Sequence, residues 1–367
     1  MAHTTMKPPP TKLVDDLVVE ILSRVPAKSL MRFQCISRAW LAFTSDIYYR
    51  TKLPATMSGL FYTISTWNAD TSWSSDIQYL SLSVDRTIDT TLSFLPPLQN
   101  LDILDSCNGL LLCKSCNAKS EDDCYYVCNP ATKKWITLPK PDESLDNFFL
   151  AFDPQVSHHF HVLHFDDGVK RTRTKLEIFS SKTGEWVHSQ VHWEDNMAYM
   201  LSFPGVFFDG IVHMLSAEDY VLGFDHKGNI CSKIKLPETE SFGNKWIGCS
   251  GGYLNLAFKR EDKIKFWILK DYCNNEWVLK HSMDVETIPH KERSKTVDPE
   301  FYLQDFDYFD IVAFHPDLDV VFLQVGDELL AYHLNTARTE ELVSLRCEWL
   351  AKFYTYSPCL LDSFGGI

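Results

Sequence analysis

The feature that most constrains this chain is a hairpin unit that recurs five times between residues 125 and 345. Each copy has an apolar strand, a short polar turn and a second strand, which opens on Trp135, Trp186 or Trp277 in three copies. The copies are "YYVCNPATKKWITLP" (125–139), "LEIFSSKTGEWVHSQ" (176–190), "VLGFDHKGNICSKIKLP" (221–237), "FWILKDYCNNEWVLKHS" (266–282) and "LAYHLNTARTEELVSL" (330–345). Such a unit cannot bury both faces alone, so neighbouring copies must stack on one another.

The full repeating unit is longer than this hairpin. A further apolar strand precedes every copy ("GLLLC", "FHVLHF", "GIVHML", "GYLNLAF" and "VVFLQV"), and two copies have yet another before it, "LAFDP" and "IVAFHP". Four strands, here called A to D in chain order, over about 40–50 residues match the size of a propeller blade. With residues 58–82 as a degenerate first blade, the sequence predicts an all-β propeller of about six blades over 58–367. The segment "FYTYSP" (353–358) is expected to close the ring against the first blade.

The N-terminal part is different in character. Residues 1–11, with three prolines in "PPP", predict a disordered tail. Residues 12–50 predict an all-α module of three short helices, in which Leu13, Leu17, Ile21 and Val25 form one apolar stripe and Pro26 ends the first helix. A linker over 51–57 follows. So short a module buries little surface on its own, and the spacing allows two arrangements: a cap on the C-terminal domain, or docking on a partner.

The stretch "LVDDLVVEILSRVPAKSLMRFQCISRAW" (13–40) resembles an F-box, the module that binds the SKP-type adaptor of cullin–RING ubiquitin ligases. It is similar above all to plant F-box proteins, although Val14 stands where the family usually has proline. The resemblance implies that the apolar stripe contacts the adaptor. The implied adaptor-binding residues are Leu13, Leu17, Ile21, Leu22, Pro26, Leu30, Ile36 and Trp40.

The repeats resemble the kelch-like, F-box-associated region of the same proteins, most clearly in "NGLLL" followed by "YYVCNPATKKW". Both resemblances together imply the substrate-recognition subunit of an SCF-type ubiquitin ligase, which holds a target protein and reaches cullin and RING subunits through the adaptor. Such a receptor has no catalytic residue and needs no metal or cofactor. Two alternatives stay open: a propeller enzyme or ligand-binding protein with incidental N-terminal helices, and an F-box protein that acts outside a ligase.

The net charge and the cysteine content indicate which kinds of partner and which cellular compartment suit the chain. The net charge is -14, from Lys+Arg 35 against Asp+Glu 49, which disfavours nucleic acid as a partner. No apolar run approaches the roughly 20 residues that span a bilayer, so no membrane partner is expected. Eleven cysteines do not form an even disulfide framework. We therefore expect free thiols and a cytoplasmic and/or nuclear protein.

Two clusters of potential metal ligands have simpler explanations. The first cluster consists of four cysteines that bracket a hairpin, Cys113, Cys116, Cys124 and Cys128. Their spacing departs from familiar zinc motifs. Cysteine in an apolar strand also behaves as a small hydrophobic residue. His158, His159, His161 and His164 form the second cluster. His159 and His161 could share one face of a strand, yet a solvated strand end explains the cluster better. The sequence thus predicts no metal site.

Loop lengths predict where a target docks. If the strands alternate in direction, turns A–B and C–D lie at one end of the ring and connections B–C and D–A at the other. The second set is longer and differs from blade to blade, as binding loops do (114–123, 166–175, 192–203 and 286–300). The predicted target-binding residues are Arg171, Arg173, Tyr199, Met200 and Phe203. An alternative places Tyr199–Phe203 in an outer strand packed in the core.

Overall fold

The structure is a computed structural model that describes most of residues 57–366 and two N-terminal positions. The described residues are 17, 21, 57–67, 73–82, 88–96, 99–116, 123–142, 147–165, 173–192, 201–216, 219–237, 244–288, 309–345, 351–359, 361 and 364–366.

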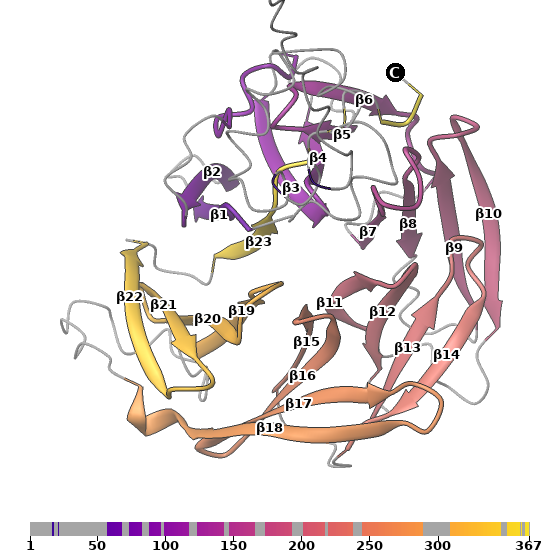
Figure 1. Ribbon diagram of the computed structural model, residues 1–367. Coiled ribbons are helices and arrows are strands. Elements are labelled where there is room, and N and C mark those ends of the chain that lie inside the picture. Colours follow the sequence, from indigo (N-terminus) through magenta and orange to yellow (C-terminus); the bar gives the residue numbers. More distant parts are fainter. Residues whose placement is uncertain are drawn as a thin grey trace, which may run out of the picture.

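The described chain forms six antiparallel sheets, here called blades 1 to 6 (Figure 1). Blade 1 has three strands, β1 (Gly59–Trp67), β2 (Trp73–Ser81) and β23 (Lys352–Tyr356). Blade 2 has β3 (Gln99–Cys107), β4 (Leu110–Cys116), β5 (Asp123–Asn129) and β6 (Lys134–Leu138). Blade 3 has β7 (Phe148–Ala151), β8 (His161–Phe165), β9 (Arg173–Ser180) and β10 (Glu185–His192).

The remaining blades repeat the same order of four strands. Blade 4 has β11 (Leu201–Phe208), β12 (Ile211–Ser216), β13 (Tyr220–Phe224) and β14 (Ile230–Lys235). Blade 5 has β15 (Asn244–Ser250), β16 (Tyr253–Arg260), β17 (Lys263–Asp271) and β18 (Glu276–Asp284), followed by the 3-10 turn η2 (Val285–Thr287). Blade 6 has β19 (Phe309–Phe314), β20 (Val320–Val325), β21 (Glu328–His333) and β22 (Arg338–Ser344).

The six sheets close into a ring. Strand A of each blade is innermost, and these strands contact one another in the cyclic order β23, β3, β7, β11, β15, β19 and back to β23 (Figure 1). The predicted propeller of six blades is therefore confirmed, and so is the degenerate first blade, in which the described residues form three strands and no strand D. Leu92 and Leu95, which follow β2 in the chain, are buried between blades 1 and 2.

The ring is closed by pairing the two ends of the described propeller. Strand β23 lies beside β1 in antiparallel register, with Gly59 opposite Tyr356 and Thr63 opposite Lys352. The amide of Ser58 also donates to the carbonyl of Tyr356 over 2.9 Å. The prediction that "FYTYSP" closes the ring is confirmed. This pairing removes the exposed edge that an open first blade would present.

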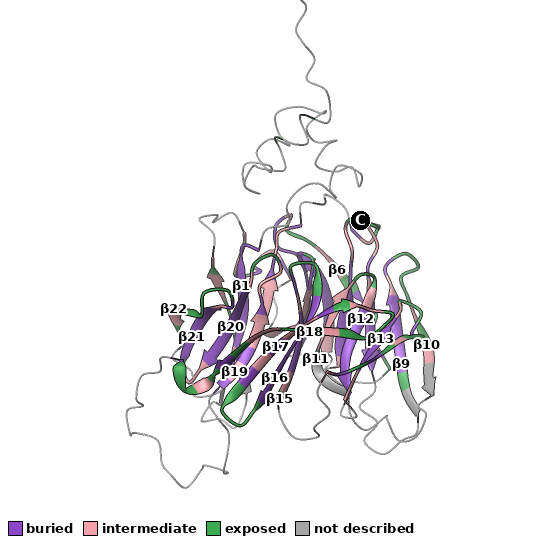
Figure 2. Ribbon diagram, turned by 60° about the horizontal axis from the view of Figure 1, so that its bottom comes forward, coloured by how far each residue is buried: buried purple, intermediate pink, exposed green. Residues whose placement is uncertain are grey.

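Each interface between neighbouring blades has its own hydrophobic cluster, because alternate residues of a strand point to opposite sides of its sheet. Leu111 and Cys113 point toward blade 1, whereas Leu110 and Leu112 on the same strand point toward blade 3. Strands B and C are therefore buried on both faces, which explains their nearly continuous apolar sequences. Figure 2 shows the buried strands inside the ring and the exposed turns at its ends.

The A strands have polar residues that bond to neighbouring A strands. In β3 the Asp105 carboxylate accepts from the Leu150 amide of β7 over 2.6 Å, and the Ser106 hydroxyl donates to the Thr355 carbonyl of β23 over 2.6 Å. Trp246 of β15 donates to Asp310 of β19 in the same way. The repeat pattern identified strand A only in β7 and β19, since these polar residues break the apolar pattern elsewhere.

The predicted three-helix module lies almost entirely outside the described residues. Leu17 and Ile21, which are one helical turn apart, are both α-helical. The three-helix arrangement of 12–50 therefore stays a prediction.

Candidate functional site

The antiparallel order of each blade gives the ring two different ends. We call the end with the A–B and C–D turns the turn face, and the end with the B–C and D–A connections the loop face. The A–B turns of neighbouring blades touch: Asn108 donates to the Phe152 carbonyl over 2.7 Å, and the Gly251 amide donates to the Pro316 carbonyl over 2.7 Å.

The turns of the turn face are tight and repetitive. In four blades the residue immediately before strand D has a positive φ, between 50° and 75°. These residues are Lys133, Gly184, Asn275 and Ala337. Three of the A–B turns are two-residue turns with left-handed backbone, Asn108-Gly109, Asp209-Gly210 and Gly251-Gly252. Two-residue turns of this kind match the twist of antiparallel strands and join them without extra chain.

The propeller chain both begins and ends at the turn face. Ser58, which precedes β1, accepts a hydrogen bond from Leu82 just after β2. After β23 the chain continues across the same face as a C-terminal tail, whose described residues are 357–359, 361 and 364–366. Figure 1 shows the C-terminal end beside β6.

The C-terminal tail is packed between blades 2 and 3. Leu361 and Phe364 are 1% and 0% exposed and belong to the hydrophobic cluster of that interface. Asn129 donates to the Cys359 carbonyl over 2.8 Å, and the Gly365 amide donates to the His158 carbonyl over 2.8 Å. The tail is thus an integral part of the turn face, which the repeat pattern did not predict.

Comparison with known families identifies both parts of the chain. Residues 60–304 match the model of the F-box associated beta propeller domain, and residues 11–51 match the F-box domain. The chain belongs to the F-box associated beta propeller family. The propeller extends past the matched range, because blade 6 and β23 lie after residue 304. The kelch-like part of the sequence resemblance stays a prediction.

Several F-box proteins of Arabidopsis thaliana are similar over most of their length. F-box protein At5g49610 is 27% identical over 75% of this chain and 79% of its own length. F-box protein At5g07610 is 28% identical over 75% of this chain and 71% of its own length. F-box protein At5g03970 is 22% identical over 89% of this chain and 82% of its own length.

The "NGLLL…NPATKKW" pattern of this F-box associated propeller has a structural explanation. Asn108 and Asn129 fix neighbouring backbone at the turn face, as described above. Gly109 has φ +87°, and a Cβ atom there would lie 2.5 Å from the Ser357 carbonyl oxygen. The three leucines that follow are fully buried. The pattern is therefore the place where the C-terminal tail docks.

Two of the predicted adaptor-binding residues of the F-box domain are described. Leu17 is 55% exposed and Ile21 is 52% exposed, so the described part of the propeller does not cover these two side chains. Leu13, Leu22, Pro26, Leu30, Ile36 and Trp40 lie outside the described residues. The docking of this module on a partner stays a prediction.

Two of the predicted target-binding residues fall on strands, at the loop face. Arg173 is the first residue of β9 and pairs with His192, the last residue of β10. Phe203 lies in β11, so the predicted loop 192–203 is too long: Leu201–Phe203 belong to an innermost strand, neither to a loop nor to an outer strand. The bulge in β11 after Ser202 and the Pro204-Gly205 pair had obscured this strand. Arg171, Tyr199 and Met200 lie outside the described residues.

The other predicted loops of the loop face are also shorter than expected. Lys114 belongs to β4 and Asp123 to β5, and their side chains form an ion pair of 3.1 Å across the hairpin. At the end of blade 5, η2 and the buried Ile288 continue the described structure beyond β18, into the predicted loop 286–300.

The tryptophans near the start of strand D lie at blade interfaces. The indole of Trp186 donates to the Pro139 carbonyl over 2.8 Å, and that of Trp277 donates to the Lys235 carbonyl over 2.9 Å. Each acceptor lies at the end of the preceding blade's strand D. Trp135 packs edge-on against Tyr126 in the cluster between blades 1 and 2. These rings therefore connect neighbouring blades.

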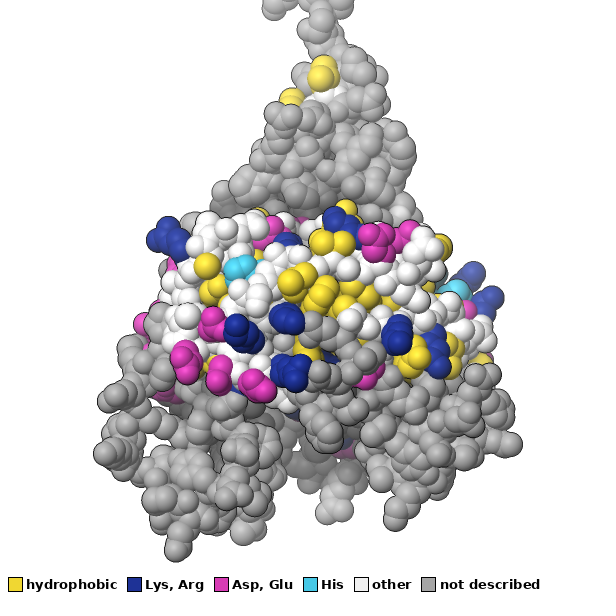
Figure 3. All heavy atoms as spheres, turned by 90° about the horizontal axis from the view of Figure 1, so that it is seen from below, with side chains coloured by type: hydrophobic (Ala, Val, Ile, Leu, Met, Phe, Trp, Pro, Cys, Tyr) yellow, Lys and Arg dark blue, Asp and Glu magenta, His cyan; other side chains and the backbone are white. Residues whose placement is uncertain are grey.

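The outer edge of the ring has a small apolar surface. Seen from the side of β18, apolar side chains gather in the middle of the described edge, with charged side chains around them (Figure 3). Val278 and Leu279 on β18 are 39% and 45% exposed. Nearby aromatic rings are partly covered, since Lys270 lies 3.9 Å from the Tyr253 ring centroid.

The cysteine cluster behaves as the sequence predicted for its strand positions. Cys113 and Cys128 are both fully buried in the cluster between blades 1 and 2. The side-chain hydrogen bond between Cys113 and Cys128 raises the pKa of the Cys113 thiol, and burial raises it further. Both cysteines therefore act as small hydrophobic residues of the core.

The interpretation of the histidine cluster as a solvated strand end is wrong for His164, whereas His161 is the partly exposed first residue of β8. Burial, together with the neighbouring His226 and His159, lowers the pKa of His161 to about 4. His164 is 1% exposed and its Nδ1 lies 2.9 Å from Glu177 Oε2. The sequence pattern did not predict this pairing, because Glu177 lies on the next strand.

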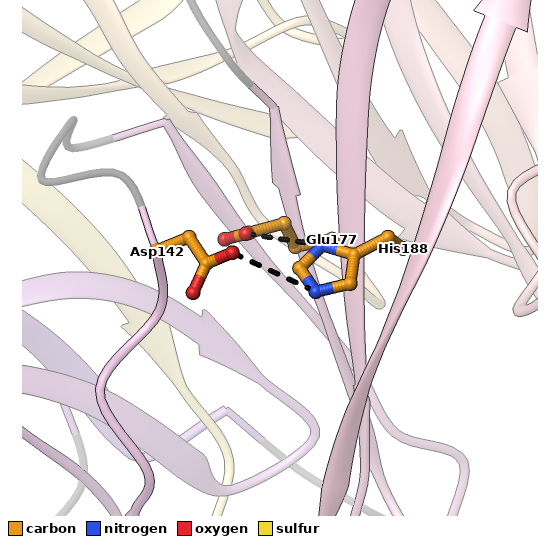
Figure 4. Close-up of side chains that lie close together, drawn as sticks. All are labelled: Asp142, Glu177 and His188. Atoms are coloured by element: carbon orange, nitrogen blue, oxygen red, sulfur yellow. Dashed lines mark ion pairs between the residues drawn. The ribbon is translucent and has the colours of Figure 1, made fainter.

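Within the part of the chain that the structure describes, one group of side chains has the arrangement of metal ligands. Asp142, Glu177 and His188 each place one ligand atom within 4.8 Å of the others'. The His188 ring lies beside both carboxylates, with Nδ1 3.4 Å from Glu177 and Nε2 3.7 Å from Asp142 (Figure 4). None of the described helices combines the length and apolar character needed to cross a bilayer.

Proposed function

We propose that this chain is the substrate-recognition subunit of an SCF-type cullin–RING ubiquitin ligase. The observation that carries the proposal is the joining of an F-box domain (11–51) to a closed six-bladed propeller in one chain. The F-box would bind a SKP-type adaptor, which in turn binds the cullin, and the propeller would hold the target protein.

The proposed mechanism is positional. The RING-bound conjugating enzyme and a target lysine are held in one assembly, which raises their effective concentration. The chain then contributes no nucleophile, acid or base, and it works in the cytoplasm, the nucleus or both.

The loop face is the proposed target-binding surface. The propeller begins at Ser58 and ends in the C-terminal tail at the turn face, so the two chain ends occupy that side of the ring. The opposite face is free of both ends, and it carries the connections that differ most in length and sequence. Variable connections on a rigid scaffold are where binding specificity usually develops.

Adaptor binding is tested by charge reversal on the apolar stripe. In the full-length variant Leu17→Asp/Ile21→Asp, two charges would enter an apolar contact, and pull-down of a SKP-type adaptor should be lost. Leu318→Asp is the matched control, since Leu318 is also 55% exposed but lies on the propeller. Equal adaptor binding by the double variant and the parent contradicts the proposal.

Target binding is tested separately. Short Gly-Ser segments in place of 166–172 and 193–200 should leave adaptor binding intact and abolish capture of ubiquitinated partners from proteasome-blocked cells. Retained capture, combined with loss on substitution of turn-face residues, would place the target on the other face. Ubiquitination of captured partners in a reconstituted ligase distinguishes a ligase receptor from an F-box protein that acts elsewhere.

A further inference from the structure

A row of four side chains crosses blade 3 from its inner to its outer strand. Phe148, His164, Glu177 and His188 are direct partners in the strand register, one on each of β7, β8, β9 and β10. The Phe148 and His164 rings are stacked, with centroids 4.1 Å apart and planes 11° from parallel. Direct register partners lie on the same face of a sheet, and Phe148 packs on Tyr125, so the row faces blade 2.

The carboxylate of Glu177 is held rigidly in this row. Glu177 is 4% exposed, and its two oxygens have different neighbours: Oε2 lies 2.9 Å from His164 Nδ1, and Oε1 lies 3.4 Å from His188 Nδ1. A buried carboxylate oriented by a histidine is typical of metal ligands, whose outer neighbours fix their direction.

Asp142 reaches the row from the connection between blades 2 and 3. The carbonyl of Pro139, at the start of this connection, is bound by the indole of Trp186. Trp186 and His188 are two residues apart on β10 and therefore lie on the same face of that strand. The tryptophan thus guides the connection along β10 and brings Asp142 to the exposed side of His188.

We propose that Asp142, Glu177 and His188 form a zinc-binding site. One zinc ion binds only one of the two His188 nitrogens, and with one ligand atom from each residue the three atoms lie within 4.8 Å of one another. Four-coordinate zinc places its ligand atoms about 3.3 Å apart, at about 2.0–2.1 Å from the metal, so the three groups would draw together by up to about 1.5 Å. The side chains of Asp142 and His188 are 77% and 62% exposed, which gives them room to rotate inward while Glu177 stays fixed. The fourth position faces solvent.

The donor set explains the choice of metal. One imidazole nitrogen with two carboxylates suits zinc, whereas calcium and magnesium prefer oxygen donors alone. A site of this kind would join the blade 2–3 connection to strand β10 at the loop face. It requires no assumption about the ligase, so the site and the proposed function can fail independently.

The experiment is a calorimetric titration of zinc chloride into the purified full-length chain, in a buffer that does not bind metals. The parent is expected to bind one equivalent that Asp142→Asn and His188→Asn each weaken by about tenfold or more. Both positions are exposed, so the variants should fold, and circular dichroism checks this. His333→Asn is the matched control. His333 lies 3.8 Å from one carboxylate, that of Glu340 on the outer strand β22, but among the described residues it belongs to no group of three potential metal ligands.

Cobalt provides a second measurement, since its visible absorption intensifies when it enters a site of low coordination number. The parent and His333→Asn should show this absorption, and both site variants should lose it. Unchanged zinc affinity in Asp142→Asn and His188→Asn would overturn the proposal by placing any bound zinc elsewhere. Absence of the zinc equivalent in the parent would overturn it too, and would leave the group as an ion-pair cluster.

Discussion

The two faces of the propeller are built differently. At the turn face, short turns with left-handed residues are bound to one another and to the C-terminal tail by side-chain and backbone hydrogen bonds. At the loop face, the connections differ in length and sequence from blade to blade. The contacts that close the ring are therefore concentrated at the turn face, and the loop face can vary in sequence without loss of the fold.

The difference has a physical origin in the chain ends. Because β23 lies beside β1, the chain enters and leaves the ring at the turn face. Contacts between residues more than 200 positions apart, such as Asn129 with Cys359, accumulate there. Such contacts stabilise the closed ring, whereas a loop that only connects adjacent strands contributes little.

The largest expected effect on stability is at Phe364, on the turn face. Phe364→Ala removes a fully buried ring between blades 2 and 3 and should lower the free energy of unfolding by about 3–5 kcal/mol. Urea unfolding of the full-length chain measures the loss. Val156→Ala, at a position 75% exposed on the same face, is the control and should be nearly neutral. A Phe364→Ala protein as stable as the parent would show that the tail does not hold the ring.

The next prediction compares substitutions at two glycines, in order to separate the free-energy cost of backbone strain from that of displacing the C-terminal tail. Gly109 and Gly210 both have positive φ in A–B turns, but a Cβ atom meets nothing within 4 Å at Gly210 and meets the tail at Gly109. Gly210→Ala should cost about 1–2 kcal/mol for its left-handed backbone. Gly109→Ala should cost about 1–2 kcal/mol more, because the tail must also shift. Equal losses in chemical unfolding would mean that the tail contact adds no stability.

A pH-dependent effect is expected at Asp105, which joins blades 2 and 3 at the inner ring. Burial raises the pKa of Asp105 to about 7, although the Leu150 and Ser106 amides oppose the shift. Between about pH 4 and pH 7 the folded state therefore binds more protons than the unfolded state, and stability falls as the pH rises through this window. The melting temperature of Asp105→Asn, relative to the parent, should increase over the same window. Parallel melting curves for the two proteins would rule out this carboxylate as the cause.

The smallest expected effect is at the loop face. Replacing residues 166–172 with a Gly-Ser segment of equal length should change the free energy of unfolding by no more than about 0.5 kcal/mol, as for most surface changes. Thermal and urea unfolding both measure it. A loss comparable to that of Phe364→Ala would remove the distinction between the two faces.

The sequence alone determined the class of fold and the number of blades, although it identified strand A in only some of them. Strands B and C lie between two neighbouring blades, so both faces are apolar, and the C–D turn repeats the same residue types before a strand that opens on tryptophan in three blades. Local patterns of this kind need no knowledge of distant contacts, which is why six blades and the closing strand could be predicted. The F-box resemblance was equally local, within residues 13–40.

Only the tertiary structure decided the parts that depend on distant partners. Asp105 and Ser106 make β3 look like a loop in sequence, because the groups that satisfy them are on β7 and β23. His164 and Glu177 form a buried pair across two strands, and Asp142 reaches His188 from a connection whose Pro139 carbonyl accepts a hydrogen bond from Trp186. A polar side chain can be buried when a partner is present, and where that partner lies is set by the closed ring rather than by neighbours in sequence.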